Sequence, residues 1–200
     1  MSYVHEVFEV FDLDKAKNVV LTDDPTDPRK FNRETALLID TIKRQNIITD
    51  KSLVLDYGCG MGRVSRELIK TFGCEVLGLD PSPSMTFLAR EYVGSSRFHT
   101  LSQYTTPDSV DVVLCSFVLQ HVEFPQKEID NIKRVLKPGG TFILLNERTR
   151  FVPSDVDRDG YVVWKNDGFD VHAEVSNILN IVDVQPYTDD SHKIVFFHKQ

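Results

Sequence analysis

The sequence has few cysteines, no long apolar run and no excess of basic charge. Its three cysteines, Cys59, Cys74 and Cys115, have neither the spacing of metal ligands nor the even number of a disulfide framework. No window approaches the roughly 18 consecutive apolar residues that a membrane-spanning helix requires. The 30 acidic against 23 basic residues disfavour a nucleic-acid partner, because phosphate binding normally draws on clustered lysine and arginine.

The N-terminal residues also lack the features of a targeting segment. Residues 1–15 carry acids and have neither a basic lead nor a continuous apolar stretch, which argues against a secretory signal peptide. With the cysteine usage, this predicts a cytoplasmic protein without a membrane association. A length of 200 residues is enough for one domain with a substantial core, so we expect a single domain over 1–200.

The first 46 residues read as two helices joined by a hinge. Val4, Val7, Phe8 and Phe11 have the spacing of one helix face. Residues 22–29 contain two prolines and three acids and interrupt regular structure. A second helix is expected over about 32–46, with Ala36, Ile39 and Ile42 facing inward. Residues 1–30 would form a lid over a ligand site, or else pack on the sheet or on a second subunit.

From residue 53 onward, predicted strands and helices alternate. The expected strands are 53–57, 74–80, a weak one near 97–101, 110–115 and 141–146, with helices between them. Residues 180–187 and 192–199 are two further strand candidates separated by TDDS, which predicts a hairpin. Repeated strand–helix units predict an α/β fold with a parallel sheet covered by helices on both faces. The hairpin would add an antiparallel strand at one side.

A glycine-rich turn follows the first strand. Gly58, Gly60 and Gly62 form G-x-G-x-G, where glycines permit positive φ and let a ligand approach the backbone. The helix that follows offers free N–H groups and a partial positive charge. Asp80 ends the second strand, where a carboxylate can accept both hydroxyls of a ribose. These features place an adenosine at the switch point of an open sheet.

Two residues in the turn discriminate between possible cofactors. The dinucleotide fingerprint G-x-G-x-x-G has its third glycine where this chain has Arg63, a poor fit for close helix–strand packing. Asp56 would place a carboxylate near a pyrophosphate, which is repulsive, whereas a ligand carrying an ammonium and a sulfonium suits it. The electrostatics favour S-adenosylmethionine over NAD.

Four segments, in order, resemble a known family. VLDYGCGMG (54–62), VLGLDPSPSM (76–85), DVVLCSFVLQHV (111–122) and IKRVLKPGG (132–140) are similar to motifs of class I S-adenosylmethionine-dependent methyltransferases, in particular the small type 11 branch. The resemblance implies a Rossmann-like three-layer sandwich with a seven-stranded, mostly parallel sheet. It also implies a cofactor-binding core over 50–146 and a substrate-side loop and hairpin over 147–200.

The same resemblance implies roles for individual residues. Gly58, Cys59 and Gly60 would line the methionine portion of the cofactor, with Asp56 nearby, and Asp80 would bind the ribose. Pro81 and Met85 would flank the adenine, and Ser116, Phe117 and His121 would border the cofactor and face the substrate. The family often has an acid after the third strand; here Ser102 and Gln103 stand in for it.

Methyl transfer from a sulfonium mainly requires alignment, and a base is needed only if the nucleophile must lose a proton. His121 is the candidate base; the alternative is that it only positions its loop. Glu147, Arg148 and Arg150 follow the fifth strand, and either arginine could hold a carboxylate or phosphate of the substrate. The alternative is that these are solvated loop charges.

The segment 154–167 contains D-x-D-x-D-G, in which Asp155, Asp157 and Asp159 could supply oxygen ligands to calcium. Its twelfth position is Asn166 rather than glutamate, so we expect an acidic loop over the active face and no metal site.

We therefore expect a methyltransferase that uses S-adenosylmethionine and acts on a small molecule. Two alternatives remain at this point: an inactive, cofactor-binding partner subunit, and an NAD(P)-dependent oxidoreductase. A homodimer or a complex with a second protein is compatible with either methyltransferase reading.

Overall fold

The computed structural model describes residues 8–19, 29–100, 106–147, 149–156, 158, 162–188 and 192–200. Its main feature is a seven-stranded sheet in the order β3-β2-β1-β4-β5-β9-β8. The strands are β1 (Leu53–Tyr57), β2 (Glu75–Leu79), β3 (Phe98–His99), β4 (Val110–Ser116), β5 (Leu136–Leu145), β8 (Asn180–Tyr187) and β9 (His192–His198). The first five are parallel, and β9 runs antiparallel to β5 and β8. The predicted α/β architecture with an antiparallel strand from a C-terminal hairpin is confirmed.

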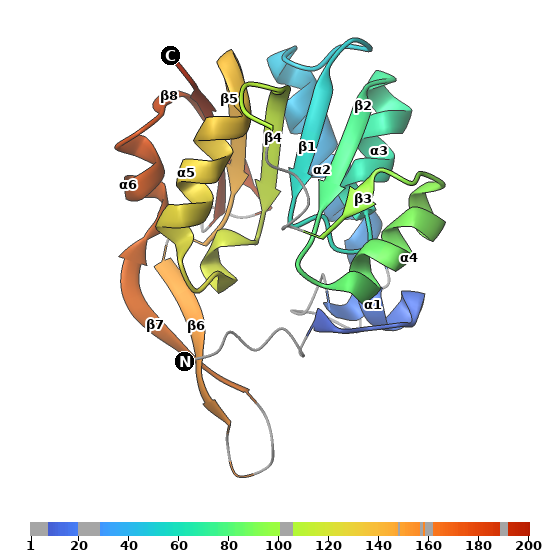
Figure 1. The fold of residues 1–200 in the computed structure, drawn as a ribbon, viewed down its shortest axis with the longest axis vertical. Helices are drawn as coiled ribbons and strands as arrows, with labels where there is room; N and C mark the ends of the chain where they lie inside the picture. Colours follow the sequence, from blue (N-terminus) through green and yellow to red (C-terminus); the bar gives the residue numbers. More distant parts are fainter. Residues whose placement is uncertain are drawn as a thin grey trace.

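Helices cover both faces of this sheet (Figure 1). They are α2 (Lys30–Gln45) and α3 (Arg63–Phe72) on one face, α5 (Pro125–Val135) and α6 (Val171–Ser176) on the other, and α4 (Pro83–Val93) beside β3. The alternation of side chains along β1 explains the three layers. Val54 packs with Leu38 of α2 and Leu68 of α3, whereas Leu55 packs with Ile132 of α5.

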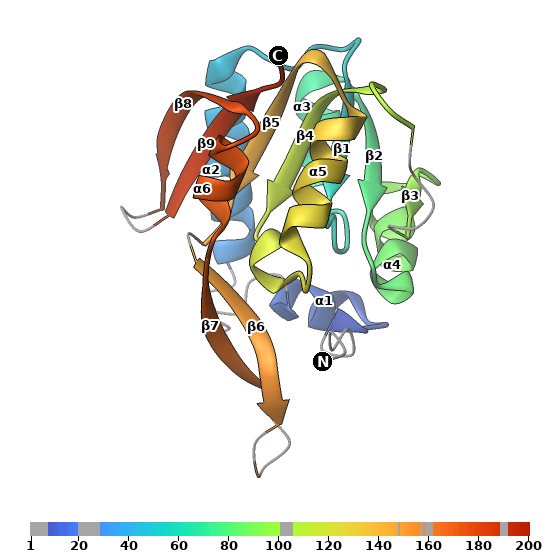
Figure 2. The same cartoon turned by 60° about the vertical axis from the view of Figure 1, so that its left-hand side comes forward.

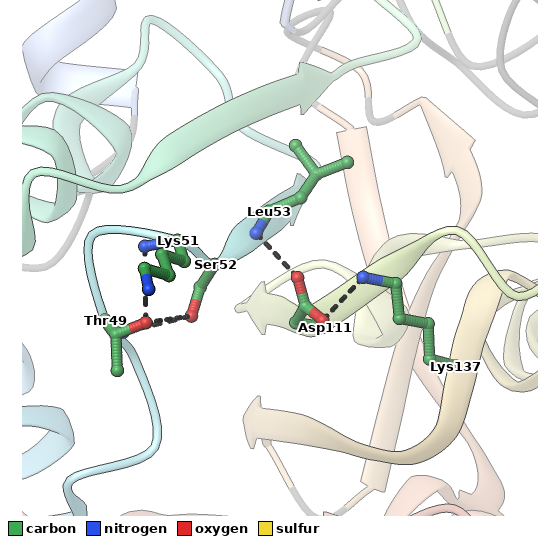
Figure 3. A network of polar contacts seen from close by, with 6 residues as sticks. All are labelled: Thr49, Lys51, Ser52, Leu53, Asp111 and Lys137. Atoms are coloured by element: carbon green, nitrogen blue, oxygen red, sulfur yellow. Dashed lines mark hydrogen bonds and ion pairs between the residues drawn. The ribbon is translucent and has the colours of Figure 1, made fainter.

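A polar network ties the amino-terminal ends of the central strands together (Figure 3). One oxygen of the Asp111 carboxylate on β4 accepts a hydrogen bond from the Leu53 backbone N–H on β1 at 2.8 Å. The other oxygen accepts from Lys137 Nζ on β5 at 2.6 Å. Three adjacent strands are thereby joined at one edge of the sheet, opposite the edge at which the glycine turn lies.

The N-terminal helix differs from the prediction. Val4 and Val7 lie outside the described residues, and the described helix here is α1 (Leu13–Val19). It begins after Phe11, which is 80% exposed and therefore does not belong to a buried helix face. The reason is an N-cap: the Asp12 carboxylate accepts from the N–H groups of Asp14 and Lys15 at 3.0 and 2.9 Å.

One buried position and one boundary differ from the prediction. In α2, Ile39 and Ile42 are buried as predicted, but Ala36 is exposed, and the buried stripe also contains Thr35 and Leu38. This i, i+3, i+4, i+7 set follows the helix period better than the predicted set. Strand β5 begins at Leu136, so KPGG lies inside the strand, and the Lys199 N–H and C=O pair with this segment at Gly140 and Gly139.

The segment 147–170 was expected to be a loop, but most of it is a two-stranded antiparallel ribbon. Its strands are β6 (Thr149–Val156) and β7 (Val162–Asp170), which form a sheet of their own. Figure 2 shows the ribbon extending away from the main sheet. Asp155 belongs to β6, and Asp157 and Asp159 lie outside the described residues.

Candidate active site

The turn between β1 and α3 is fixed against the end of β2. Gly58 has φ +76°, and the N–H groups of Gly58 and Cys59 both donate to the Leu79 carbonyl, at 2.7 and 2.9 Å. A Cβ on Gly58 would lie 2.2 Å from a methyl carbon of Val118. The space at this glycine is therefore filled by the segment that follows β4, which packs directly over the turn, rather than left for a ligand.

Two buried carboxylates flank the turn. Asp56 and Asp80 are 3% and 8% exposed. The Ser65 hydroxyl donates to Asp56 at 2.5 Å, and the two oxygens of Asp80 accept from the Gly60 and Ser82 N–H groups, at 2.8 and 3.0 Å. Burial raises the pKa of each carboxyl to about 6, although these hydrogen bonds oppose the shift.

This electrostatic environment has a chemical consequence. A carboxylate whose pKa is raised by burial gains from any ligand that brings a positive charge or hydroxyl donors. A diphosphate would bring further negative charge to the same place. The prediction that the turn suits a cationic ligand is therefore consistent with the environment of both acids.

The two acids open onto one cavity of about 530 Å³ at the carboxyl-terminal edge of the sheet. Ten of the predicted site residues line it: Asp56, Gly58, Cys59, Gly60, Asp80, Pro81, Met85, Ser116, Phe117 and His121. Ser102, Gln103 and Arg148 lie outside the described residues, and Arg150 belongs to β6, with its side chain outside the described part. The fold thus brings together residues from three separate sequence segments.

Ser116 and Cys59 have different relations to this cavity. The Ser116 hydroxyl is buried and finds no hydrogen-bond partner within the described part of the chain. A buried polar atom of this kind normally has a hydrogen-bond partner, so the position of the Ser116 hydroxyl on the cavity wall fits a polar group of a ligand.

Burial raises the pKa of the Cys59 thiol well above its ordinary value, and Asp80 and Asp56 raise it further. Its environment therefore disfavours the thiolate that a nucleophile would need.

His121 lies on the cavity wall in a 3₁₀ turn, Leu119–His121, after β4. Its Nε2 lies 3.1 Å from Nε2 of the neighbouring Gln120 amide, and its ring centroid lies 5.8 Å from that of Phe8. Phe8 is itself part of the cavity wall. The Phe8 carbonyl accepts from Ser82 at 3.3 Å and the Val10 N–H donates to Ser84 at 3.0 Å, so residues 8–10 are attached to the start of α4.

The cavity lining also contains residues that the sequence did not identify. They are Lys30, Arg33, Glu34, Arg63, Gln120, Tyr187 and His192, together with Glu147, which was considered only as a loop charge. Arg63 is 7% exposed, donates to Thr35 at 2.7 Å and lies over the Phe31 ring at 5.7 Å. The position of Arg63 directly after the glycine turn was a sequence signal that it lines the site. The sequence held no such signal for Tyr187 and His192, because only the order of the strands in the sheet brings them to the cavity.

The sheet order, the glycine turn and the acid that ends β2 together define the class of the domain. They have the arrangement expected of class I S-adenosylmethionine-dependent methyltransferases, with Asp80, Asp56 and Ser116 as fitting partners for that cofactor. Residues 55–144 match the family described as "Methyltransferase domain", type 11. Over residues 55–144 the chain forms a class I methyltransferase domain of this branch, whose cofactor is S-adenosylmethionine.

Curated relatives are similar over this part of the chain. The human thiol S-methyltransferase TMT1B is 29% identical over 126 residues, which cover 58% of this chain and 51% of the relative. A ubiquinone biosynthesis O-methyltransferase of Paraburkholderia phymatum is 34% identical over 102 residues, 44% of this chain and 40% of the relative. The chain therefore spans about half the length of the curated relatives that it matches.

Among solved structures, the PH0226 protein of Pyrococcus horikoshii OT3 has a TM-score of 0.70 and 18% sequence identity, with both chains covered completely. At this identity the likeness concerns the fold alone. In the described part of the chain, no helix combines the length and the apolar character needed to cross a membrane.

Proposed function

We propose that this chain transfers a methyl group from S-adenosylmethionine to a small-molecule acceptor by in-line displacement. The observation that carries the proposal is a cavity of about 530 Å³ that the two buried acids line together with a group of aromatic and ionisable side chains. Its volume lies in the range of about 300–1,000 Å³ that is typical of sites for small molecules.

The acid side would hold the cofactor. Asp80 would accept the ribose hydroxyls, because each of its oxygens has lone-pair capacity beyond the one backbone hydrogen bond that it accepts. Asp56 would face the ammonium, and the Ser116 hydroxyl would bond a polar group of the ligand. Pro81 and Met85 would contact the adenine, with Ser102 and Gln103 proposed for its amino group.

The bound cofactor supplies an electrophilic methyl group on a positively charged sulfur, so the protein's main task is alignment. Phe117, Val118 and His121 would border the reacting groups and exclude water. His121 would act as a base if the acceptor has to lose a proton. Arg148 and Arg150, which follow β5 in the sequence, would hold an acidic group of the acceptor.

The printed names of the two curated relatives support a small acceptor. One describes methylation of a thiol, and the other describes O-methylation in ubiquinone biosynthesis. Both reactions place the methyl group on a heteroatom of a small molecule. The identity of the acceptor of this chain remains the finer part of the proposal.

Calorimetry and a labelled-methyl assay test the proposal together. We expect S-adenosylhomocysteine to bind and NAD to give no heat, and we expect label from S-adenosylmethionine to enter a member of a panel of small thiols, phenols and amines. Binding of NAD instead would indicate an oxidoreductase. Binding of S-adenosylhomocysteine with transfer only after a second protein is added would indicate a subunit that depends on its partner.

A further inference from the structure

Glu147 and His192 form a hydrogen-bonded pair on the wall of the cavity. The imidazole Nε2 of His192 lies 2.6 Å from a carboxylate oxygen of Glu147, and both residues line the cavity. Their side chains are 22% and 39% exposed, so they are partly desolvated and still accessible to a ligand. A histidine held by a carboxylate is the usual arrangement of a general base, because the carboxylate fixes the tautomer and stabilises the imidazolium.

The backbone of Glu147 is held on both sides. Its N–H donates to the Gln120 side-chain oxygen at 2.9 Å, and its carbonyl accepts from the Asn146 amide at 2.8 Å. Asn146 is buried, and its own side-chain oxygen accepts from the Gln120 N–H at 3.4 Å. Glu147, two residues after the end of β5, is thereby fixed to the segment that follows β4.

The imidazole of His192 is also positioned by an aromatic ring. Its ring centroid lies 5.4 Å from that of Phe117, with an interplanar angle of 77°, which is an edge-to-face arrangement. Phe117 has φ +56°, a conformation that a non-glycine residue adopts only where its surroundings impose it. Its N–H donates to the Leu145 carbonyl, two residues before Glu147, at 2.6 Å. The ring that contacts His192 is thus tied to the strand that carries the glutamate.

Other ionisable groups face the same cavity and would influence its pH dependence. Among the described residues these are Lys30, Arg33, Glu34, Asp56, Arg63, Asp80, His121 and Tyr187. The Tyr187 ring centroid lies 6.2 Å from that of Phe117, the ring that also contacts His192. His121 Nε2 lies 3.1 Å from the side-chain amide nitrogen of Gln120.

We propose that His192, oriented by Glu147, is the general base of the proposed methyl transfer, and that the acceptor atom is the oxygen or sulfur of an O–H or S–H group. The acceptor gives its proton to the neutral imidazole of His192 and its own electron pair to the methyl carbon. The pair that bonded the methyl to sulfur stays on that sulfur, and the imidazolium later releases its proton to solvent. The inference rests on the proposed function and adds the chemical class of the acceptor.

A kinetic experiment compares three probes of similar size: 4-methylphenol, phenylmethanethiol and 4-methylaniline. We expect transfer to the phenol or the thiol to fall about 100-fold in His192→Gln and about 10-fold in Glu147→Gln. The wild-type rate should rise with pH along an acid limb, and Glu147→Gln should move that limb to lower pH because the carboxylate no longer favours the imidazolium. The neutral aniline needs no base before attack, so its rate should change less than about 3-fold. His198→Gln, on the exposed far end of the same strand, is the matched control and should retain the wild-type profile.

A second readout does not depend on turnover. In the S-adenosylhomocysteine complex, added 4-methylphenol or phenylmethanethiol should shift the NMR signals of the His192 imidazole and leave those of His198 in place. The proposal is overturned if neither probe shifts His192, if only the aniline is methylated, or if the variants keep the wild-type rate and pH profile. Failure of S-adenosylhomocysteine to bind would instead overturn the proposed function, so the two failures are distinguishable.

Discussion

Asp80 illustrates how one buried side chain can be both costly and useful. It is 8% exposed, and its two backbone hydrogen bonds do not offset the burial that raises its pKa to about 6. The same carboxyl therefore binds a proton more readily than an exposed aspartate does, and it binds hydroxyl donors strongly when ionised.

We predict that Asp80→Asn weakens S-adenosylhomocysteine binding about 10- to 100-fold at pH 7.5, since hydrogen bonds to a charged acceptor contribute about 1.5–3 kcal/mol. Wild-type affinity should decrease below about pH 6 as Asp80 becomes protonated, and the variant should show a flatter dependence. Titration calorimetry at pH 5 and 7.5 measures both effects. Asp40→Asn, at an exposed position of α2, is the control. An affinity of Asp80→Asn within twofold of wild type would contradict the ribose role.

Gly58 gives a prediction about the packing of the turn. Gly58→Ala should lower the free energy of unfolding by about 1–2 kcal/mol for the positive φ alone. The variant should lower the free energy of unfolding further because the added methyl lies 2.2 Å from Val118. The double variant Gly58→Ala, Val118→Ala should lack this clash, so urea unfolding should show that the effects of the two changes on stability are not additive. Strict additivity would mean that Val118 does not fill this space.

The residues of the cavity also show what the sequence could predict. Asp56, Gly58 and Asp80 were found because each lies at the carboxyl end of a predicted parallel strand, where such sheets bind ligands. His192 was missed because it lies at the start of a strand, and Arg63 because it was judged only as a misfit for a dinucleotide. Long-range pairs such as Glu147 with His192 leave no local pattern in the sequence.

At the scale of elements, strongly periodic segments were predicted well and boundaries less well. Helices α3 and α5 were placed by Leu68, Ile129 and Ile132, all of which are buried. Asp12 determines the start of α1 through its carboxylate, a capping signal that the apolar spacing of the preceding residues obscured. The ribbon β6–β7 was missed because its polar, acidic sequence resembles a loop, and strand pairing depends on partners more than on composition.

The polar network in which Asp111 joins Leu53 of β1 to Lys137 of β5 gives a prediction at the scale of elements. Burial would raise the pKa of Asp111, but the hydrogen bonds from Leu53 and Lys137 and the lysine charge outweigh it, so this pKa lies below its ordinary value. A depressed pKa contributes stability above about pH 4 that is lost as the pH falls through the folded-state pKa. We expect Asp111→Asn to lower the free energy of unfolding by about 1–2 kcal/mol at pH 7.

Denaturant unfolding at pH 7 and at acid pH measures this effect, and the difference from wild type should shrink in acid. Asp108→Asn, which removes the ion pair of a more exposed carboxylate with Lys199, is the matched control and should cost less than about 0.5 kcal/mol. An equal decrease in the free energy of unfolding for the two variants would show that the Asp111 network contributes no more to stability than the Asp108–Lys199 pair.

At the scale of the whole molecule, the two buried acids make the stability of the free protein depend on pH. Both have a pKa raised to about 6, so between about pH 4 and 6 the folded state binds more protons than the unfolded state. Their contribution to stability is therefore present in acid and is lost as the pH rises through 6. A cationic ligand removes much of this cost by pairing with the charged form.

We predict that, between pH 5 and 7.5, the free protein loses stability relative to the double variant Asp56→Asn, Asp80→Asn. The loss has an upper bound of about 1.4 kcal/mol for each carboxylate, because only about one pKa unit of the shift lies between pH 5 and the folded-state pKa of about 6. S-adenosylhomocysteine at 100 times its Kd should stabilise the wild type by about 2.7 kcal/mol, a rise in Tm of roughly 5–10 °C, and NAD should not. Thermal and urea unfolding at the two pH values measure these differences; a stability that rises with pH relative to the double variant would contradict the sign.

The reversed direction of β9 has a consequence for how such a site can change. In the parallel strands β1, β2, β4 and β5, the lining residues Asp56, Asp80, Ser116 and Glu147 lie at or just after the carboxyl end. In β9 it is the first residue, His192, that lines the cavity, and the last residue of β8, Tyr187, lies beside it. A change in the connection between these two strands would alter the acceptor wall while leaving β1, β2 and their glycine turn intact. The C-terminal hairpin can therefore diversify the choice of acceptor independently of the part of the sheet that recognises the cofactor.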